Sequence, residues 1–354
     1  MLKVAIMLEC FSVGGAQRVV SELVKNLDQS QCELRVICCE NRADTSMARA
    51  IEEIAHVEYL SISGKNIISN FRKAFSALDQ FKPDIIHAHL TSQLYAVPWG
   101  ILHKIPVLIT AHTKPNQAFV KKIEPLIRWG IKRSRVHIVT VSHENHQMMK
   151  EYFSIDNSCC SCINNGIAIN DFYRTDHTNF TFINVARQDE NKNQAAIVRC
   201  FARLYAQSPN TRLLLVGDGP CHTKLIEQCS ELGIMGAVEL PGAVANVADY
   251  YAKADVYVQS SHREAMPMSA LEAMAAGLCI ISTDVGGMRD IVNGNGILVE
   301  DHDEASLQKA MKALFDCLPD EIEQYRMVSR QIVERYSSKS MAHKYMDLFV
   351  KLAS

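Results

Sequence analysis

The chain has 354 residues, of which 48% are hydrophobic and 21% charged, and its formal net charge is -2. This length and apolar content allow two domains of ordinary size, each with its own core, and exclude a disordered or fibrous protein. The charge is unevenly distributed, since residues 1–170 carry 19 Lys and Arg against 15 Asp and Glu, and the remainder carries 18 against 24. The first half is therefore the one expected to meet an anionic surface.

Twelve cysteines are scattered along the chain without metal-ligand spacing, which is typical of a reducing compartment and predicts a cytoplasmic protein. The run Cys159-Cys160-Ser161-Cys162 has the character of a strand, because adjacent residues of a strand alternate between faces. No apolar stretch approaches the roughly 18–20 residues of a membrane span. The opening segment Met1–Leu8 runs into Glu9 without a small-residue cleavage site, which predicts a first strand and not a signal peptide.

Short apolar runs separated by helical patterns are typical of parallel α/β sheets. In the first half they are Val4–Leu8, Leu34–Cys39, Ile85–Ala88, Val107–Ala111 and Ile138–Val141. After a polar, turn-rich segment at 164–178 they resume as Phe180–Val185, Leu213–Val216, Val256–Gln259, Cys279–Ser282 and Ile297–Val299. We predict two doubly wound Rossmann-like domains, 1–168 and 169–339, facing each other across a cleft, with a C-terminal helix at about 340–354 packing back on the first.

In such sheets ligands bind at the carboxyl ends of the strands. The adjacent Gly14 and Gly15 follow the first strand, where they either admit a phosphate to the backbone amides or serve a tight turn of positive φ. His87 and His89 end another strand of this domain, in acceptor-side or structural roles. A metal is not expected there, because no carboxylate or cysteine joins them at ligand spacing.

The segment 117–135 is rich in cations and has apolar residues at helical spacing. It either lies on an anionic membrane to reach a lipid-linked acceptor, or packs on the core with a solvated basic face and a kink at Pro125. On the first alternative the protein is peripheral on the inner face of the membrane. The contacting residues would be Lys121, Lys122, Arg128, Lys132 and Arg133.

In the second half, Arg187 and Lys192 lie five positions apart where a strand passes into a helix. Two cations on one loop can hold a leaving diphosphate without a metal, although a pair of solvated charges has the same pattern. Gly217-Asp-Gly-Pro220 repeats the arrangement of strand, glycine turn and Pro-initiated helix.

The most informative segment is Ser260–Gly277, which sets Glu264 in a loop and Glu272 eight positions on, in the following helix. Pro267 suits the first turn of that helix and Gly277 its end. The free amides of residues 265–269 would face an anion, with the helix dipole behind them. Glu264 would then face a group attached to that anion, and Glu272 could accept two hydroxyl protons.

Taken in order, these motifs together with Asn165-Gly-Ile, Leu240-Pro241-Gly242 and Thr283-Asp-Val-Gly-Gly287 resemble family 4 glycosyltransferases of the GT-B fold. The resemblance covers nearly the whole chain and is strongest over 183–300. The seven residues between Glu264 and Glu272 match the spacing of the family's signature.

The resemblance implies a role for each matching position. Arg187 and Lys192 would hold the donor diphosphate, Glu272 the ribose hydroxyls, and Glu264 would lie beside the donor sugar. His112, at the end of a first-domain strand, would lie near the reacting sugar. The implied catalytic set is His112, Glu264, Arg187 and Lys192. The remaining donor contacts would come from Gly14, Gly15, Gly217, Pro241, Gly242, Ala265, Met266, Pro267 and Met268.

Two positions depart from the family pattern. Ala265 replaces the usual glycine after the first glutamate, which puts the loop geometry in doubt because alanine disfavours positive φ. Gln17 replaces a glutamate and removes a charge from a position expected on the acceptor side. Neither change removes a cation or carboxylate of the donor site.

The implied chemistry is transfer of a sugar with retention of configuration, through either a front-face ion pair or a transient covalent species. Fixed cations and helix amides would stabilise the departing diphosphate, so no cofactor and no metal are expected. In Asp301-His-Asp303, the second aspartate is expected to cap a helix.

The partners expected are a nucleotide sugar and a saccharide or lipid-linked acceptor, in cell-surface or capsular polysaccharide synthesis, and no nucleic acid. The alternatives are a catalytically silent sugar-nucleotide-binding regulatory subunit and a nucleotide-sugar epimerase of the same architecture.

Overall fold

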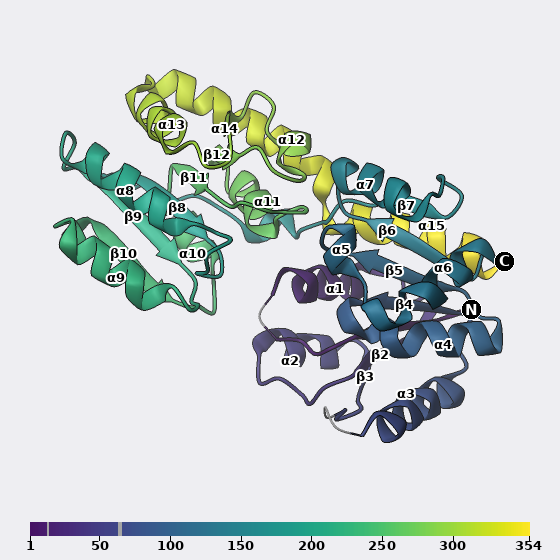
Figure 1. Ribbon diagram of the computed structural model, residues 1–354. Helices are drawn as coiled ribbons and strands as arrows, with labels where there is room; N and C mark the ends of the chain where they lie inside the picture. Colours follow the sequence, from purple (N-terminus) through teal and green to yellow (C-terminus); the bar gives the residue numbers. More distant parts are fainter. Residues whose placement is uncertain (13, 63–65) are drawn as a thin grey trace. The chain divides into compact units, whose positions relative to one another are not determined.

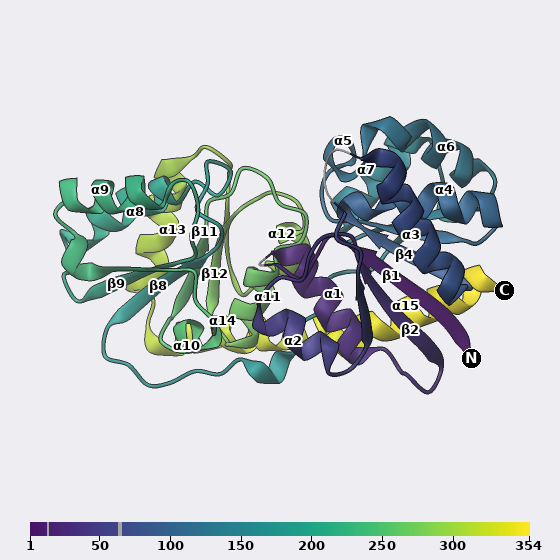
Figure 2. The same ribbon diagram turned by 90° about the horizontal axis from the view of Figure 1, so that it is seen from below.

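The structure is a computed structural model that describes residues 1–12, 14–62 and 66–354. The chain divides into two compact units, the first formed by Met1–Gly166 with Ser338–Ser354 and the second by Ile167–Ser337. In each, helices cover both faces of a parallel sheet (Figures 1 and 2). The predicted α/β class with two doubly wound domains is confirmed.

The sheet of the first unit has the order β3-β2-β1-β4-β5-β6-β7, seven strands among the described residues, all paired in parallel. Every apolar run predicted for this half is a strand. Sequence periodicity missed the edge strand at 56–59, which is polar and only half-buried and therefore lacks a long apolar run. The strands are β1 (Leu2–Leu8), β2 (Cys32–Cys38), β3 (His56–Tyr59), β4 (Ile85–His89), β5 (Val107–Ala111), β6 (Val136–Thr140) and β7 (Cys160–Cys162).

Helices of the first unit occupy both faces of this sheet, and the C-terminal helix packs against the first helix and β4 on one face. Figure 2 shows the C-terminal helix in yellow beside that first helix. The last helix thus belongs to the first unit. The sequence predicted that it packs on this unit. The helices are α1 (Gly15–Asn26), α2 (Ser46–Glu52), α3 (Ile67–Phe81), α4 (Gln93–His103), α5 (Pro115–Ala118), α6 (Glu124–Lys132), α7 (His143–Phe153) and α15 (Ser338–Ala353).

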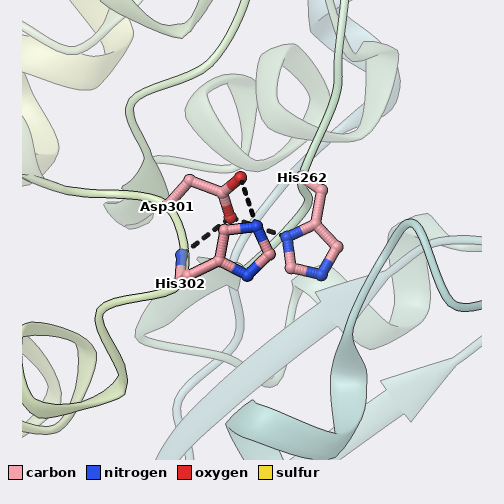
Figure 3. A group of neighbouring side chains, drawn as sticks. All are labelled: His262, Asp301 and His302. Carbon is pink, nitrogen blue, oxygen red and sulfur yellow. Dashed lines mark hydrogen bonds and ion pairs between the residues drawn. The ribbon is translucent and has the colours of Figure 1, made fainter.

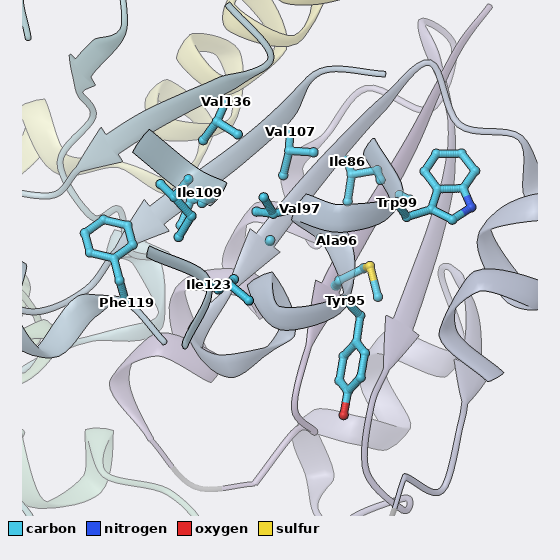
Figure 4. Close-up of a cluster of buried hydrophobic side chains, with 14 of the residues drawn as sticks. Ile86, Tyr95, Ala96, Val97, Trp99, Val107, Ile109, Phe119, Ile123 and Val136 are labelled. Carbon is cyan, nitrogen blue, oxygen red and sulfur yellow. The ribbon is translucent and has the colours of Figure 1, made fainter. Parts of the chain in front are cut away.

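The opposite face of the first sheet carries a large apolar core. Alternate residues of β4 and β5, such as Ile86, Val107 and Ile109, meet Val97 and Trp99 of α4 (Figure 4). Residues of α3, α6 and α7 complete the cluster. The alternation of strand side chains leaves the remaining residues of β4 and β5, including two histidines, on the α15 side.

The basic segment at 117–135 is divided into short pieces. Pro125 occupies the first turn of α6, where its missing N–H costs nothing, so the kink that belonged to the core-packing alternative is not needed. Ile127 and Ile131 are buried in the core. Arg128 binds Glu124 at 2.9 Å and lies over the rings of Tyr152 and Phe153, so this cation is paired and only partly exposed. A short 3-10 turn, Lys121–Ile123, precedes α6.

The sheet of the second unit has the order β10-β9-β8-β11-β12-β13, six strands in the part of the chain that is described. All its predicted runs are strands, and only Val238–Gly242 was not predicted, because Pro241 and Gly242 interrupt its apolar pattern. The strands are β8 (Phe180–Val185), β9 (Thr211–Val216), β10 (Val238–Gly242), β11 (Val256–Gln259), β12 (Cys279–Thr283) and β13 (Gly296–Val299).

One face of this sheet is covered by α8, α9 and α13, whose apolar residues form a second core cluster. The predicted helices at 304–316 and 320–335 correspond to α13 and α14. The helices are α8 (Gln194–Tyr205), α9 (His222–Glu231), α10 (Ala248–Tyr251), α11 (Met268–Ala275), α12 (Met288–Ile291), α13 (Glu304–Asp316) and α14 (Pro319–Val333).

Each sheet has a switch point, where successive strands are added in opposite directions. It lies between β1 and β4 in the first unit and between β8 and β11 in the second. Ligands of open parallel sheets bind outside the carboxyl ends of the strands at such points. Gly14 and Gly15 follow β1, Arg187 follows β8, and Glu264 lies in the loop after β11, so the predicted residues flank both switch points.

Candidate functional site

The loop after β8 and the loop after β11 are joined at the switch point of the second unit. Lys192 Nζ donates to Glu264 Oε1 at 2.5 Å, and both side chains are mostly buried. The sequence predicted that both residues belong to the donor site, with Lys192 holding the diphosphate and Glu264 lying beside the sugar. The structure brings their side chains into direct contact.

Backbone hydrogen bonds hold the same two loops together. The His262 amide donates to the Asn191 carbonyl at 2.8 Å, and the Asn191 side-chain amide donates to the Arg263 carbonyl at 3.0 Å. Ser260 Oγ donates to the carbonyls of Lys192 and Asn193. The position of Lys192 is therefore fixed by the backbone around it as well as by its own ion pair.

Arg187 is placed differently from Lys192. Its side chain is 72% exposed, and its nearest carboxylate is Asp189 at 3.8 Å. The carbonyl of Arg187 accepts from Gln194 Nε2 at 3.1 Å, which anchors the backbone of the loop to the start of α8. An exposed guanidinium on an anchored backbone can turn toward an incoming anion, since its rotamers are not fixed by packing.

Glu272 lies on α11 and is nearly completely buried. The hydroxyl of Tyr251 donates to Glu272 Oε2 at 3.2 Å and to the Ser269 carbonyl at 2.9 Å. A buried carboxylate is costly unless it is hydrogen-bonded, so Tyr251 stabilises its position. This tyrosine was not identified from the sequence, because it lies on a short helix far from the glutamate pair.

The helix that carries Glu272 begins one residue later than predicted. Pro267 is the N-cap of α11 and Met268 its first residue, while Gly277 ends the helix with φ 75°, as expected for a residue after a C-cap. The first amides of a helix have no partners within the helix, so its start remains suited to an anion. Met266, Pro267 and Met268 are buried.

The loop at Ala265 needs no left-handed residue there. Positive φ occurs at several non-glycine residues in the described chain, and Ala265 is not among them. Its carbonyl accepts from the Gly287 amide at 2.6 Å. Gly286, with φ 60°, packs so closely that an added Cβ would lie 2.3 Å from the Glu264 carbonyl oxygen. The left-handed backbone therefore lies in the opposing Gly286-Gly287 turn, and alanine fits at 265.

Glycines and a proline at the ends of β9 and β10 form the neighbouring edge of this region. The Gly217 amide donates to the Gly242 carbonyl at 2.9 Å, and both residues have positive φ. A Cβ on Gly217 would lie 2.0 Å from the Ala186 carbonyl oxygen, so this glycine allows β8 and β9 to approach closely. A Cβ on Gly242 would meet nothing within 4 Å, so its surroundings are open. Pro241 precedes it in β10.

In the first unit, Gly14 is the N-cap of α1 and Gly15 its first residue. Gly14 has an extended backbone with φ 178°, which any residue adopts, so the hypothesis of a positive-φ turn is wrong. A Cβ on Gly15 would meet nothing within 4 Å, and one on Gly14 would meet the Gln17 side chain. Gln17 is nearly buried and folds back on this turn.

His112 follows β5 and is linked to a buried histidine. Its Nε2 lies 2.9 Å from Nδ1 of His89, and burial lowers the pKa of His112 to about 4. His87 Nε2 lies 2.8 Å from Thr110 Oγ1, which in turn meets the Tyr345 hydroxyl of α15 at 3.0 Å. At neutral pH His112 is therefore an uncharged imidazole.

His87 and His89 have no exposed surface. Desolvation and the neighbouring imidazoles lower the pKa of each well below its usual value. Neither ring presents an atom to an acceptor in this structure, and their contacts to His112, Thr110 and α15 fit the structural alternative that the sequence left open. Sequence reasoning could not connect them with His112, because the residues lie on different strands.

Two family models match the chain. The model described as "Glycosyltransferase Family 4" matches residues 13–171, and the model described as "Glycosyl transferases group 1" matches 168–331. The chain belongs to the family 4 glycosyltransferases. Sequence relatives of this family 4 protein include an uncharacterized glycosyltransferase of Methanocaldococcus jannaschii, 24% identical, with 64% of this chain and 62% of the relative aligned.

N-acetyl-alpha-D-glucosaminyl L-malate synthase of Bacillus anthracis is 25% identical, with 82% of this chain and 81% of the relative aligned. Among solved structures, Anabaena HepE in complex with UDP and glucose has a TM-score of 0.84 at 16% identity, over 99% of this chain and all of the other. Sucrose-phosphate synthase of Thermosynechococcus elongatus has a TM-score of 0.79 at 18% identity, over 99% of each chain. The fold of this family 4 protein is therefore GT-B.

Among the described residues, no helix combines the length and the apolar character needed to cross a membrane.

Proposed function

We propose that the chain transfers a hexose from a nucleotide-sugar donor to a saccharide or lipid-linked saccharide acceptor, with retention of configuration and without a metal ion in the transfer. The observation that carries the proposal is the Lys192–Glu264 contact at the switch point of the second sheet, just before the start of α11. A cation, a carboxylate and helix amides there meet the needs of a diphosphate with a sugar attached.

Departure of a nucleoside diphosphate develops negative charge on its outer phosphate. Lys192 and the start of α11 would stabilise that charge as it forms, and Arg187 would add a second cation. Glu272, held by Tyr251, would accept the ribose hydroxyls. His112 would contact the donor sugar as a neutral imidazole.

A panel of UDP-, GDP- and ADP-sugars tests the donor site by calorimetry. The Anabaena relative was solved with UDP-glucose, which makes UDP-sugars the first donors to try. We expect one class to bind, and Lys192→Met to weaken binding roughly 10- to 100-fold, because charge-assisted hydrogen bonds contribute about 1.5–3 kcal/mol. Glu272→Gln should act in the same direction.

Lys312→Met is the matched control, since Lys312 is a half-exposed lysine of the same unit whose described contacts are with Asp316 and Phe315 of its own helix. Equal affinities of the Lys192 and Lys312 variants, or no binding by any donor, would refute the donor site.

Turnover distinguishes the alternatives: a silent subunit binds donor without reaction, and an epimerase alters the sugar without an acceptor. Nuclear magnetic resonance of the product reports the retained configuration.

We further propose that the acceptor belongs to cell-surface or capsular polysaccharide synthesis and that exposed cations of the first unit contact an anionic membrane. Lys121, Lys122, Lys132 and Arg133 are exposed, and Trp129 beside them is 46% exposed. An exposed tryptophan amid lysines suits a membrane interface. Sedimentation with vesicles of anionic lipid should carry the protein down, and replacing the four cations with glutamine should abolish this. Equal sedimentation of both proteins would exclude this surface.

A further inference from the structure

Three potential metal ligands converge at the end of the second sheet, outside the Lys192–Glu264 contact. His262 comes from the loop after β11, and Asp301 and His302 form the turn between β13 and α13 (Figure 3). One ligand atom from each side chain lies within 4.8 Å of the others. Sequence reasoning considered only the Asp-x-Asp spacing here and did not pair either histidine with Asp301.

The carboxylate of Asp301 lies at the centre of this group. His262 Nδ1 is 2.7 Å from Oδ1, and His302 Nε2 is 3.3 Å from Oδ2. The two imidazole rings stack with centroids 4.2 Å apart. Asp303, the other aspartate of the motif, caps α13 as expected by accepting from the Ser306 amide. Asp301 is thus the carboxylate of the motif that faces the histidines.

Backbone conformation directs His302 toward the other two side chains. His302 has φ 64°, in the left-handed region that disfavours residues other than glycine. Such a conformation costs on the order of 1–3 kcal/mol and is often found at ligand sites. The Asp301 carboxylate accepts from the His302 amide at 2.8 Å, which stabilises this turn.

The group also borders a cavity of about 210 Å³. Its lining includes His262 and His302 together with Ser260, Thr283 and Glu300. A cavity of this volume holds water molecules, and hydroxyl and carboxylate groups line it. A cation bound by the three side chains could therefore take a water from this side as a further ligand.

We propose that His262, Asp301 and His302 bind a divalent transition-metal ion of the zinc, cobalt or nickel class. Imidazole and carboxylate ligands suit these ions, and two histidines with one carboxylate leave a position open for water. Bonds of about 2.0–2.1 Å in tetrahedral geometry separate neighbouring ligand atoms by roughly 3.3 Å. The 3.3 Å from His302 Nε2 to Asp301 Oδ2 already has this value. His262 Nδ1 lies 2.7 Å from the other carboxylate oxygen, Oδ1, so its ring must withdraw and the carboxylate must turn for one oxygen to serve both histidines.

The ion would join the loop after β11 to the β13–α13 turn. His262 lies two residues before Glu264, and its amide binds the carbonyl of Asn191 in the loop that carries Lys192. Binding would restrain both loops of the proposed donor site without taking part in the transfer. The metal site itself does not depend on the proposed function.

Cobalt(II) titration of the full chain under reducing conditions tests the proposal. Its visible absorption reports coordination by nitrogen and oxygen, and thiolate ligands would add charge-transfer bands, which matters because the chain has twelve cysteines. We expect one ion per chain without thiolate bands, and an increase in the thermal midpoint with cobalt. Asp301→Asn and His262→Gln should each weaken binding more than about 10-fold, since even outer-shell losses cost 10–100-fold.

His302→Asn is a further variant, because asparagine tolerates the left-handed backbone but does not replace the imidazole. His343→Gln is the control, since His343 and Asp347 form an exposed histidine–carboxylate pair to which no third ligand is added among the described residues. Absence of cobalt binding, thiolate bands, or equal affinity of wild type and the Asp301 and His262 variants would each overturn the proposal. If cobalt does not bind, the three side chains form only a hydrogen-bonded group that links the loop after β11 to the β13–α13 turn.

Discussion

The hydrogen bond between His89 and His112 links a buried side chain to a predicted site residue. A single proton lies between His89 Nδ1 and His112 Nε2, so the tautomer of one ring determines that of the other. The parallel register pairs His89 with Thr110, two residues before His112. His89 is therefore a positioning residue for His112, which the spacing of residues along the chain did not indicate.

We expect His89→Asn to retain most activity and His89→Leu to lose it. The asparagine amide can reach the position of the imidazole Nδ1 and keep the bond, whereas leucine removes it. Loss of orientation should lower kcat roughly 10- to 100-fold with little change in donor KM. Steady-state kinetics with thermal unfolding as the folding control measures this, and equal kcat of the two variants would refute it.

At the scale of elements, the turn between β12 and α12 shapes the loop that carries Glu264. Gly286 and Gly287 contact the Glu264 and Ala265 carbonyls from the opposite side. The family's usual glycine at position 265 is absent, yet the loop is accommodated because this turn supplies the left-handed residue. A substitution in this turn should therefore shift the backbone of Glu264.

We predict that Gly286→Ala weakens donor binding about tenfold, which corresponds to about 1.4 kcal/mol. The new Cβ would displace the Glu264 carbonyl, 2.3 Å away. Gly294→Ala is the matched control, because Gly294 also has positive φ but its Cβ would meet only Val328 at 3.8 Å. Gly294→Ala should lose about 1–2 kcal/mol of stability from its left-handed backbone alone, and Gly286→Ala should lose more because of the added clash. Calorimetric titration showing equal donor affinity in the two would contradict the prediction.

At the scale of the whole molecule, buried histidines make stability depend on pH. Desolvation lowers the pKa of His112 and of His137 to about 4, against about 6.5 in an unfolded chain. Between these values the unfolded chain binds protons that the folded chain does not. The free energy of unfolding must therefore fall as the pH is lowered from about 6.5 to about 4.

His137→Gln tests this dependence in denaturant unfolding of the full chain at pH 7 and pH 4.5. The glutamine amide can replace the contact of His137 Nε2 with Ser161 Oγ, 2.8 Å away, without a titrating group. The variant should lose less stability on acidification than wild type, by on the order of 2 kcal/mol. His343→Gln, at an exposed position, should behave as wild type. Parallel losses in the His137 variant and wild type would show that this group does not titrate as described.

Local patterns predicted much of this fold, because a buried parallel strand needs a continuous apolar run and a helix needs recognisable ends. The central strands and the helices at the C-terminus follow from such runs. Strands β3 and β10 do not, since an edge strand is half-solvated and Pro241 with Gly242 interrupts the second pattern. The core-packing alternative for the basic segment placed a kink at Pro125, but the helix begins there, which depends on how the preceding segment packs.

The sequence by itself determined the α/β class, the two domains and the family, since strand runs, glycine turns and the Glu264–Glu272 spacing are local properties of the chain. Only the tertiary structure decided which of these residues meet. The Lys192–Glu264 contact, the pairing of His89 with His112, and the convergence of His262 on Asp301 and His302 all join strands or loops distant in the chain. Strand order and register set these contacts, and both depend on packing across the whole sheet.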